Sequence, residues 1–182
     1  VVQNDNIIHK DDILLPYRSM KQWHKLHLAL KMMRNEEKKS GTTYTYALNT
    51  STIRGCGTLA LGDMIEIASK AGYNAIEPWV EEIDAWTHSG RTLSQLRSLV
   101  SAHDLTIVNL IGFPTWSVPD EQKRKAGFEE ARRCFDMAQE LACPYVAAPP
   151  IGIHQTPGVS LFDVADRYAA LIDLASEYNV VP

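Results

Sequence analysis

The sequence repeats a strand-then-helix pattern. Apolar runs typical of strands cover residues 46–50, 74–79, 106–111 and 145–149, and a helical pattern follows each of them. The runs begin 28, 32 and 39 residues apart, and residues 180–182 begin another. A recurrence of about thirty residues is the length of one β-α unit. Parallel strands joined by right-handed crossovers lie beside their sequence neighbours, so the pattern predicts a parallel sheet or a (β/α)8 barrel.

Capping signals mark the ends of the predicted helices. Thr92 and Ser160 each begin a capping-box pattern. Gly72 and Asn179 stand where a residue in the left-handed conformation would end a helix. Residues 119–121, a proline and two acids, are expected to open the third helix with the proline in its first turn. The local signals therefore agree with the β-α order.

The fold class follows from this order. We predict an α/β fold for residues 44–182, a partial (β/α)8 TIM barrel with about four β-α units and the start of a fifth strand. A complete barrel typically has about 250 residues, so we expect an N-terminal half. Residues 1–43 are expected to be a basic extension or linker, with one amphipathic helix as an alternative. A dinucleotide-binding domain is disfavoured because residues 54–59 contain two glycines where the fingerprint needs three.

Charge and composition exclude several classes of function. Residues 1–40 carry eight Lys and Arg against five Asp and Glu, whereas residues 41–182 carry ten against seventeen. The acidic repeat region is poorly suited to nucleic acid. No apolar run reaches the ~20 residues of a membrane-spanning helix. Three cysteines without a C-x-x-C pair indicate neither a disulfide framework nor a zinc ribbon, so we expect a reducing, cytoplasmic location.

Candidate binding residues follow from the barrel prediction, because the carboxyl ends of the strands form the active site of such a fold. A carboxylate within an apolar strand, Glu77, is costly unless it is paired or used. Its alternative role is structural, hydrogen-bonded to Asn49, Asn109 or Arg54. Aromatic side chains near the same ends are suited to wall a sugar-sized pocket. The predicted substrate-binding residues are Asn49, Glu77, Trp79, Asn109, Phe113, Trp116 and His154.

The strand ends do not supply an evident catalytic or metal-binding set. A divalent ion needs three or four His, Asp or Glu ligands that converge from several strands. The four predicted strand ends offer one carboxylate, Glu77, and no histidine. We therefore assign no metal ligand and no catalytic residue.

Three stretches carry a family resemblance. Residues 46–51 (YALNTS), 71–79 (AGYNAIEPW) and 105–110 (LTIVNL) resemble the xylose-isomerase-like TIM-barrel superfamily, and within it the sugar phosphate isomerase/epimerase group. Glu77 matches the glutamate that this family has on its second strand, and Asn49 and Trp116 match more loosely. The resemblance covers residues 44–182.

The resemblance implies a small sugar or sugar-phosphate substrate and one divalent metal, manganese, magnesium or cobalt. Two carboxylates in that group commonly bind the metal and move a proton next to a sugar carbonyl. Its metal ligands lie on later strands, beginning with the fifth, so we expect these 182 residues to be inactive alone.

Three alternatives accompany this reading. The chain is a non-catalytic half-barrel that pairs through its open sheet edges, which favour homo-oligomers, or it is part of a polyol dehydratase of the same superfamily. Endonuclease IV-like repair enzymes resemble the same barrel but place histidines where this chain has Glu77 and Asn109, so they are disfavoured.

Overall fold

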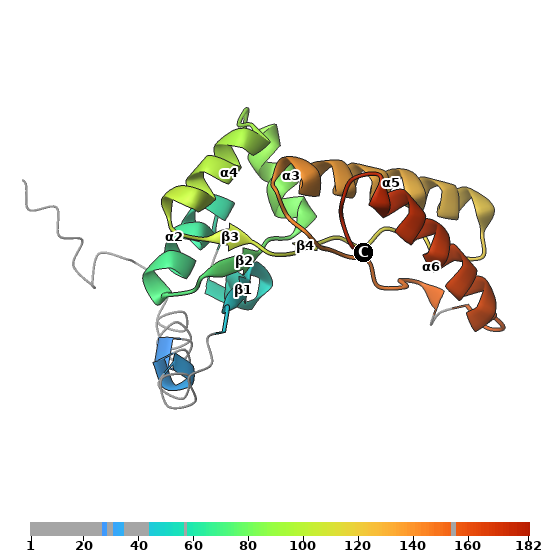
Figure 1. The fold of residues 1–182 in the computed structure, drawn as a ribbon, viewed down its shortest axis with the longest axis horizontal. Coiled ribbons are helices and arrows are strands. Elements are labelled where there is room, and N and C mark those ends of the chain that lie inside the picture. The colour runs from blue at the N-terminus through green and yellow to red at the C-terminus, as the bar shows by residue number, and fades with distance from the viewer. Residues whose placement is uncertain (1–26, 29–30, 35–43, 57, 154–155) are drawn as a thin grey trace, which may run out of the picture.

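Parallel strands alternate with helices along the chain (Figure 1). The computed structural model describes residues 27–28, 31–34, 44–56, 58–153 and 156–182, and every structural statement below concerns these. Strands β1 (Ala47–Asn49), β2 (Ala75–Glu77) and β3 (Thr106–Ile107) form a parallel sheet in that order. Strands β4 (Leu110–Ile111) and β5 (Val146–Ala147) form a second parallel pair. The prediction of parallel strands beside their sequence neighbours is confirmed.

The predicted third strand is divided in two. Residues 106–111 were expected to form one strand, but β3 pairs with β2 and β4 pairs with β5. Val108 and Asn109 lie between them. A bridge between Trp79 and Ile111 still connects the two sheets. The expectation of one continuous strand is therefore wrong, although the spatial order of the segments is the expected one.

The chain enters a fifth strand position at its last residues. Val181 forms a parallel bridge with Tyr145, and the Val146 amide donates to the Val181 carbonyl at 3.0 Å. Asn179, three residues after the last residue of the preceding helix, has φ 55°, the left-handed conformation expected for it. The described chain thus contains four β-α units and the beginning of a further strand, as a partial barrel.

Helices follow the strands in the predicted places, except that α3 (Val80–His88) was not predicted. A 3-10 helix, η1 (Thr50–Cys56), comes after β1. The α-helices are α2 (Leu61–Ala71), α3 (Val80–His88), α4 (Leu93–Ala102), α5 (Glu121–Glu140) and α6 (Leu161–Ser176). In the view of Figure 1, α3, α4 and α5 lie above the strands, and α6 returns beside α5. None of the described helices is long and apolar enough to cross a membrane.

Local capping explains where the helices begin and end. The Thr92 hydroxyl accepts from the backbone N–H of Gln95, and the Gln95 side-chain oxygen accepts from the backbone N–H of Thr92 at 2.8 Å. This pair of hydrogen bonds is the predicted capping box. Ser160 accepts from the Asp163 amide, and Gly72 ends α2 at φ 91°. The placement of a proline in the first turn of α5 is wrong. Asp120 is the N-cap and accepts from the Lys123 amide, so the proline precedes the helix.

The core is one cluster between the strands and the helices. Ile76 from β2 and Leu110 from β4 are fully buried. Their helical neighbours include Ile65, Ile83, Leu96, Phe135 and Leu171. Strands covered by helices read as apolar runs because both faces avoid water.

Part of the N-terminal segment contacts the body of the fold. Residues 27–28 and 31–34 are helical. Arg34 Nη2 donates to the Gly72 carbonyl, and His27 Nδ1 lies 3.4 Å from the Ala71 carbonyl. These contacts place the segment at the C-terminal end of α2. The rest of the predicted extension, residues 1–26, 29–30 and 35–43, lies outside the described residues.

Candidate functional site

A row of three polar side chains crosses the carboxyl ends of neighbouring strands. Asn49 and Glu77 are the last residues of β1 and β2 and are paired in register, so they lie on the same face of the sheet. Asn109 follows β3, and its Nδ2 donates to Glu77 Oε1 at 3.4 Å. All three are half-buried. The hydrogen bond expected for a structural Glu77 is therefore present, at the edge where a barrel binds its ligand.

The amide of Asn49 has a fixed orientation. Its Oδ1 accepts from the Ser51 amide at 3.1 Å, the Ser51 hydroxyl at 2.8 Å and the Trp79 indole at 3.1 Å. A backbone N–H and an indole N–H can only donate, so the atom facing them has to be the oxygen. Nδ2, a donor of two hydrogen bonds, consequently points away from this group.

Aromatic rings border the row. Trp79 and Phe113 pack edge to face, with centroids 5.1 Å apart and planes at 86°. Phe113 is 44% exposed and leaves an apolar surface open beside the polar row. The Arg54 guanidinium lies 4.5 Å from the centroid of the Trp79 ring, within the range of a cation–π contact. An apolar wall next to oriented polar groups is the usual composition of a small-molecule site.

One organising residue was missed by sequence reasoning. The side chain of Glu82 is only 10% exposed. Its Oε1 accepts from Arg54 Nε at 3.0 Å and Nη2 at 2.8 Å. Its Oε2 accepts from the Thr50 hydroxyl at 2.6 Å and the Trp79 amide at 2.9 Å. The available signal was an acid three residues after Trp79, which is the N3 position of a helix that begins at Val80.

Trp116 belongs to a different environment. It is 2% exposed, and its indole donates to the Ala148 carbonyl at 2.9 Å. Its ring lies 5.4 Å from that of Tyr168 on α6. The structure thus brings together Asn49, Glu77, Trp79, Asn109 and Phe113 and gives Trp116 a packing role beside α6. His154 lies outside the described residues.

The described residues do not fit the divalent metal that the resemblance implies. No group of three or more His, Cys, Asp or Glu side chains among them converges on one point. Glu77 is the carboxylate of the polar row, and its described partner is an amide, Asn109. The described residues therefore do not by themselves form a site for a divalent ion.

A hollow elsewhere on the surface is not part of this site. It has a volume of about 610 Å³ and is lined by Ser94, Arg97, Ser98, Ser101 and Ala102, all exposed on α4. The Ser98 hydroxyl donates to the Ser94 carbonyl of the same helix. The hollow lies on the helix surface, away from the strand ends.

Comparison with known proteins identifies the family. Parallel β-α units with polar groups at the strand ends define a barrel of the TIM type. The family model described as xylose isomerase-like TIM barrel matches residues 65–182, and the chain belongs to that family. A comparison with curated proteins gives no match.

Solved structures of the same fold extend well beyond the part that this chain matches. The IolI protein with a bound zinc atom matches with a TM-score of 0.63 at 19% identity, over 75% of this chain and 49% of its own. D-psicose 3-epimerase from Clostridium cellulolyticum H10, solved with D-tagatose, matches with a TM-score of 0.62 at 13% identity, over 75% of this chain and 50% of the epimerase chain. The probable 3-DHS dehydratase AsbF of Bacillus anthracis matches with a TM-score of 0.61 at 13% identity, over 75% of this chain and 50% of the dehydratase chain. At these identities the matches show the fold alone, and the chain spans about half the length of these proteins.

Proposed function

We propose that this chain forms a sugar-binding wall of a barrel that isomerises or epimerises a small sugar by proton transfer next to a carbonyl. The observation that carries the proposal is the row Asn49, Glu77 and Asn109 at the carboxyl ends of three neighbouring strands. Epimerases with D-fructose or D-tagatose have this fold, which supports the choice of a ketose as substrate.

The proposed roles follow from donors and acceptors. Asn49 Nδ2 is a donor held in one direction and suits a carbonyl or hydroxyl oxygen of the sugar. Glu77 uses Oε1 to accept from Asn109, so its Oε2 is proposed to accept a hydrogen bond from a sugar hydroxyl. Trp79 and Phe113 are proposed to cover the C–H face of the ligand. Trp116 is proposed to support the pocket from its buried position beside α6, and His154 stays in the proposal as a pocket residue.

The chemistry asked of these residues is binding and orientation. Proton transfer beside a carbonyl needs a base near the carbon and a group that polarises the oxygen. A divalent ion would supply that polarisation in a complete family site, and we propose metal dependence for the reaction at that level. The described residues contribute the fixed donor and acceptor positions that keep the sugar in a reactive orientation.

A dehydratase acting on a polyol is the second enzymatic candidate, favoured by the match with a probable 3-DHS dehydratase. Both candidates require the same polar row. They differ in product, because epimerisation returns a sugar of equal mass and dehydration releases water.

Ligand binding tests the proposed function directly. D-fructose and D-tagatose are titrated against the full 182-residue chain by ligand-observed NMR, and Glu77→Gln is expected to weaken binding about tenfold, equivalent to ~1.4 kcal/mol. Glu66→Gln is the matched control, since Glu66 forms a surface ion pair with Lys70 on α2. Absence of ketose binding by the wild-type chain, or equal binding by Glu77→Gln, contradicts the proposal.

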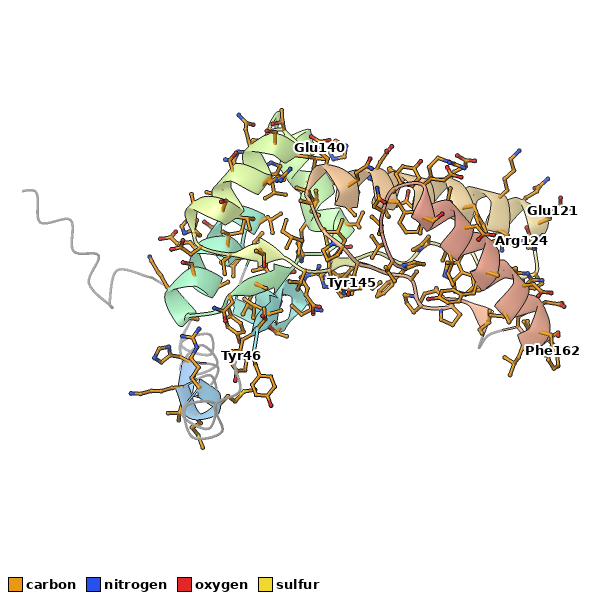
Figure 2. The ribbon with its side chains drawn as sticks, in the orientation of Figure 1. Tyr46, Glu121, Arg124, Glu140, Tyr145 and Phe162 are labelled. Carbon is orange, nitrogen blue, oxygen red and sulfur yellow. The ribbon has the colours of Figure 1, made fainter. Side chains whose placement is uncertain are left out.

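A non-catalytic candidate rests on exposed apolar surface. We define the α6 face as Leu161, Phe162, Tyr168 and Ile172, which are 75%, 85%, 37% and 45% exposed. Figure 2 shows Phe162 at the N-terminal end of α6, directed away from the fold. The Tyr168 hydroxyl donates to the Pro182 carbonyl at 2.8 Å, so this face continues into the last strand position. We propose that copies of the chain pair through it.

A further inference from the structure

The side chain of Glu82 connects three parts of the candidate site. It accepts from η1 through Thr50 and Arg54, and from the start of α3 through the Trp79 amide. The Thr50 hydroxyl also lies 3.3 Å from the Glu77 carbonyl, next to the polar row. With four donors on two oxygens, the carboxylate is fully occupied within the protein. It is therefore placed to act on a ligand only through its neighbours.

The first consequence concerns the charge of Arg54. Its Nε and Nη2 are committed to Glu82, and Nη2 also lies 2.8 Å from Glu81 Oε1. Two carboxylates thus neutralise one guanidinium, which also lies over the aromatic ring of Trp79. A cation in this state offers little attraction to an anionic group of a ligand.

The second consequence concerns the donor pattern of the wall. Trp79 is fixed through its amide by Glu82 and through its ring by Arg54, and its indole then holds Asn49 Oδ1. The side chains next to a ligand are consequently an amide donor, the carboxylate of Glu77 and apolar ring edges. Hydroxyl groups satisfy such a wall, whereas a phosphate dianion would meet the carboxylate of Glu77 and an Arg54 that is already paired with two carboxylates, the cation that the described part of the wall offers.

We propose that Glu82 is a specificity-determining residue that positions Arg54 and Trp79 so that this wall selects an uncharged, hydroxylated ligand over its phosphate ester. The inference rests on the proposed sugar-binding function and narrows its substrate class from sugars and sugar phosphates to uncharged sugars.

The experiment compares D-tagatose with D-tagatose 6-phosphate by ligand-observed NMR on the full chain. The wild type is expected to bind the uncharged sugar at least about tenfold more tightly. Glu82→Gln, which releases the guanidinium, is expected to narrow that ratio about tenfold and to make the Arg54 Nε–H resonance sensitive to added inorganic phosphate. The response of this resonance to phosphate reports whether Glu82 holds the Arg54 guanidinium. If Glu82 only stabilised the fold, the response would not change.

A second variant protects the test against misfolding of Glu82→Gln. Glu81 is 67% exposed and contacts Arg54 once, so Glu81→Gln should fold and narrow the ratio in the same direction by about threefold. Glu130→Gln is the matched control, because Glu130 pairs with Arg133 on the surface of α5. It should leave the ratio unchanged.

The outcomes separate the two proposals. Equal wild-type affinity for both sugars, tighter binding of the phosphate, or an unchanged ratio in a folded Glu82→Gln overturns the specificity role while ketose binding still supports the proposed function. If Glu82→Gln does not fold, an unchanged ratio in Glu81→Gln overturns it. Binding of neither sugar overturns the proposed function and this inference with it.

Discussion

Single side chains of this protein owe their positions to specific neighbours. The amide of Asn49 is held by three donors, and Glu82 accepts four hydrogen bonds while its side chain is almost covered. Buried polar groups of this kind are stable because every donor and acceptor finds a partner. No buried side-chain nitrogen or oxygen among the described residues lacks one. The side chains of Asn49 and Glu82 are therefore held in place before a ligand arrives.

Sequence reasoning recovered part of this site. Glu77 and Asn109 were identifiable because each is a polar residue within an apolar, strand-like run. Glu82 could not be identified in the same way, since its importance comes from Arg54, which lies 28 residues away in sequence. The buried position of Trp116 was equally hidden, because an aromatic residue after a strand fits a pocket wall and a core alike.

Glycine 127 provides a test of close packing at the residue scale. A Cβ added to Gly127 would lie 2.5 Å from the carbonyl carbon and 2.7 Å from the oxygen of Thr115, both backbone atoms. Gly127→Ala should therefore lower the free energy of unfolding by about 2 kcal/mol, in spite of the better helix propensity of alanine. Urea denaturation measures the change.

Gly62 on α2 is the matched control for this substitution. The nearest atoms to its added Cβ lie 3.8 Å away, in ordinary contact. Gly62→Ala should stabilise the protein by about 0.5–1 kcal/mol. Equal effects of the two substitutions would contradict the close approach of α5 to residue 115.

The thiol of Cys143 gives a pH-dependent prediction. Burial raises the pKa of Cys143 from 9.0 to about 11, so the folded protein favours the neutral thiol. A raised folded-state pKa gives a contribution to stability that is complete below pH 9 and is lost as the pH rises toward about 11. The free energy of unfolding should fall over this window by more in the wild type than in Cys143→Val, as urea titrations at several pH values would measure.

At the scale of elements, helix boundaries were more predictable than strand boundaries. Caps are local, so Thr92, Ser160, Gly72 and Asn179 could be placed from a few neighbouring residues. The division between β3 and β4 is not local. Residues 105–111 form one largely apolar run in the sequence. Its first part pairs with β2 and its second part with β5, so the position of the break depends on strands that are distant in the sequence. Helix α3 was missed because Trp79 is not a typical capping residue.

The N-cap of α4 allows an element-scale test. Thr92→Ala removes the side-chain acceptor of the Gln95 amide and should lower the free energy of unfolding by about 1 kcal/mol. Thr92→Ser keeps the hydroxyl and should recover most of the loss. Thermal denaturation followed by circular dichroism compares the variants. Equal loss in both would assign the effect to the methyl group and not to the cap.

The molecule as a whole has an acidic repeat region and an open apolar surface at one end. The α6 face contacts the last strand position through Tyr168, whose hydroxyl donates to the Pro182 carbonyl, and at that position Tyr145 and Val181 are 53% and 55% exposed. Exposed strand edges next to apolar side chains favour association with another chain. The barrel fold explains the surface, since each β-α unit of a barrel is normally covered by the next unit.

Self-association is therefore expected in solution. Analytical ultracentrifugation of the wild type should show a concentration-dependent dimer, and Phe162→Asp combined with Ile172→Asp should shift it toward monomer by at least about tenfold in dissociation constant. Gln122→Asp on the exposed surface of α5 should not change the association. A wild-type protein that sediments as a monomer at all concentrations would refute pairing through the α6 face.

The break between β3 and β4 has a consequence for cooperativity. It divides the strands into one group associated with α2, α3 and α4 and another associated with α5 and α6. The two groups are joined by residues 106–111, the Trp79–Ile111 bridge, the packing of α4 against α5 and the Asp84–Arg133 ion pair. Such groups commonly open as separate units, each with its own free energy of opening. Asn109 stands at the joint and contacts Glu77 of the first group. A ligand bound to both residues would lock the two units together, and native-state hydrogen exchange would then show their amides slowing in unison.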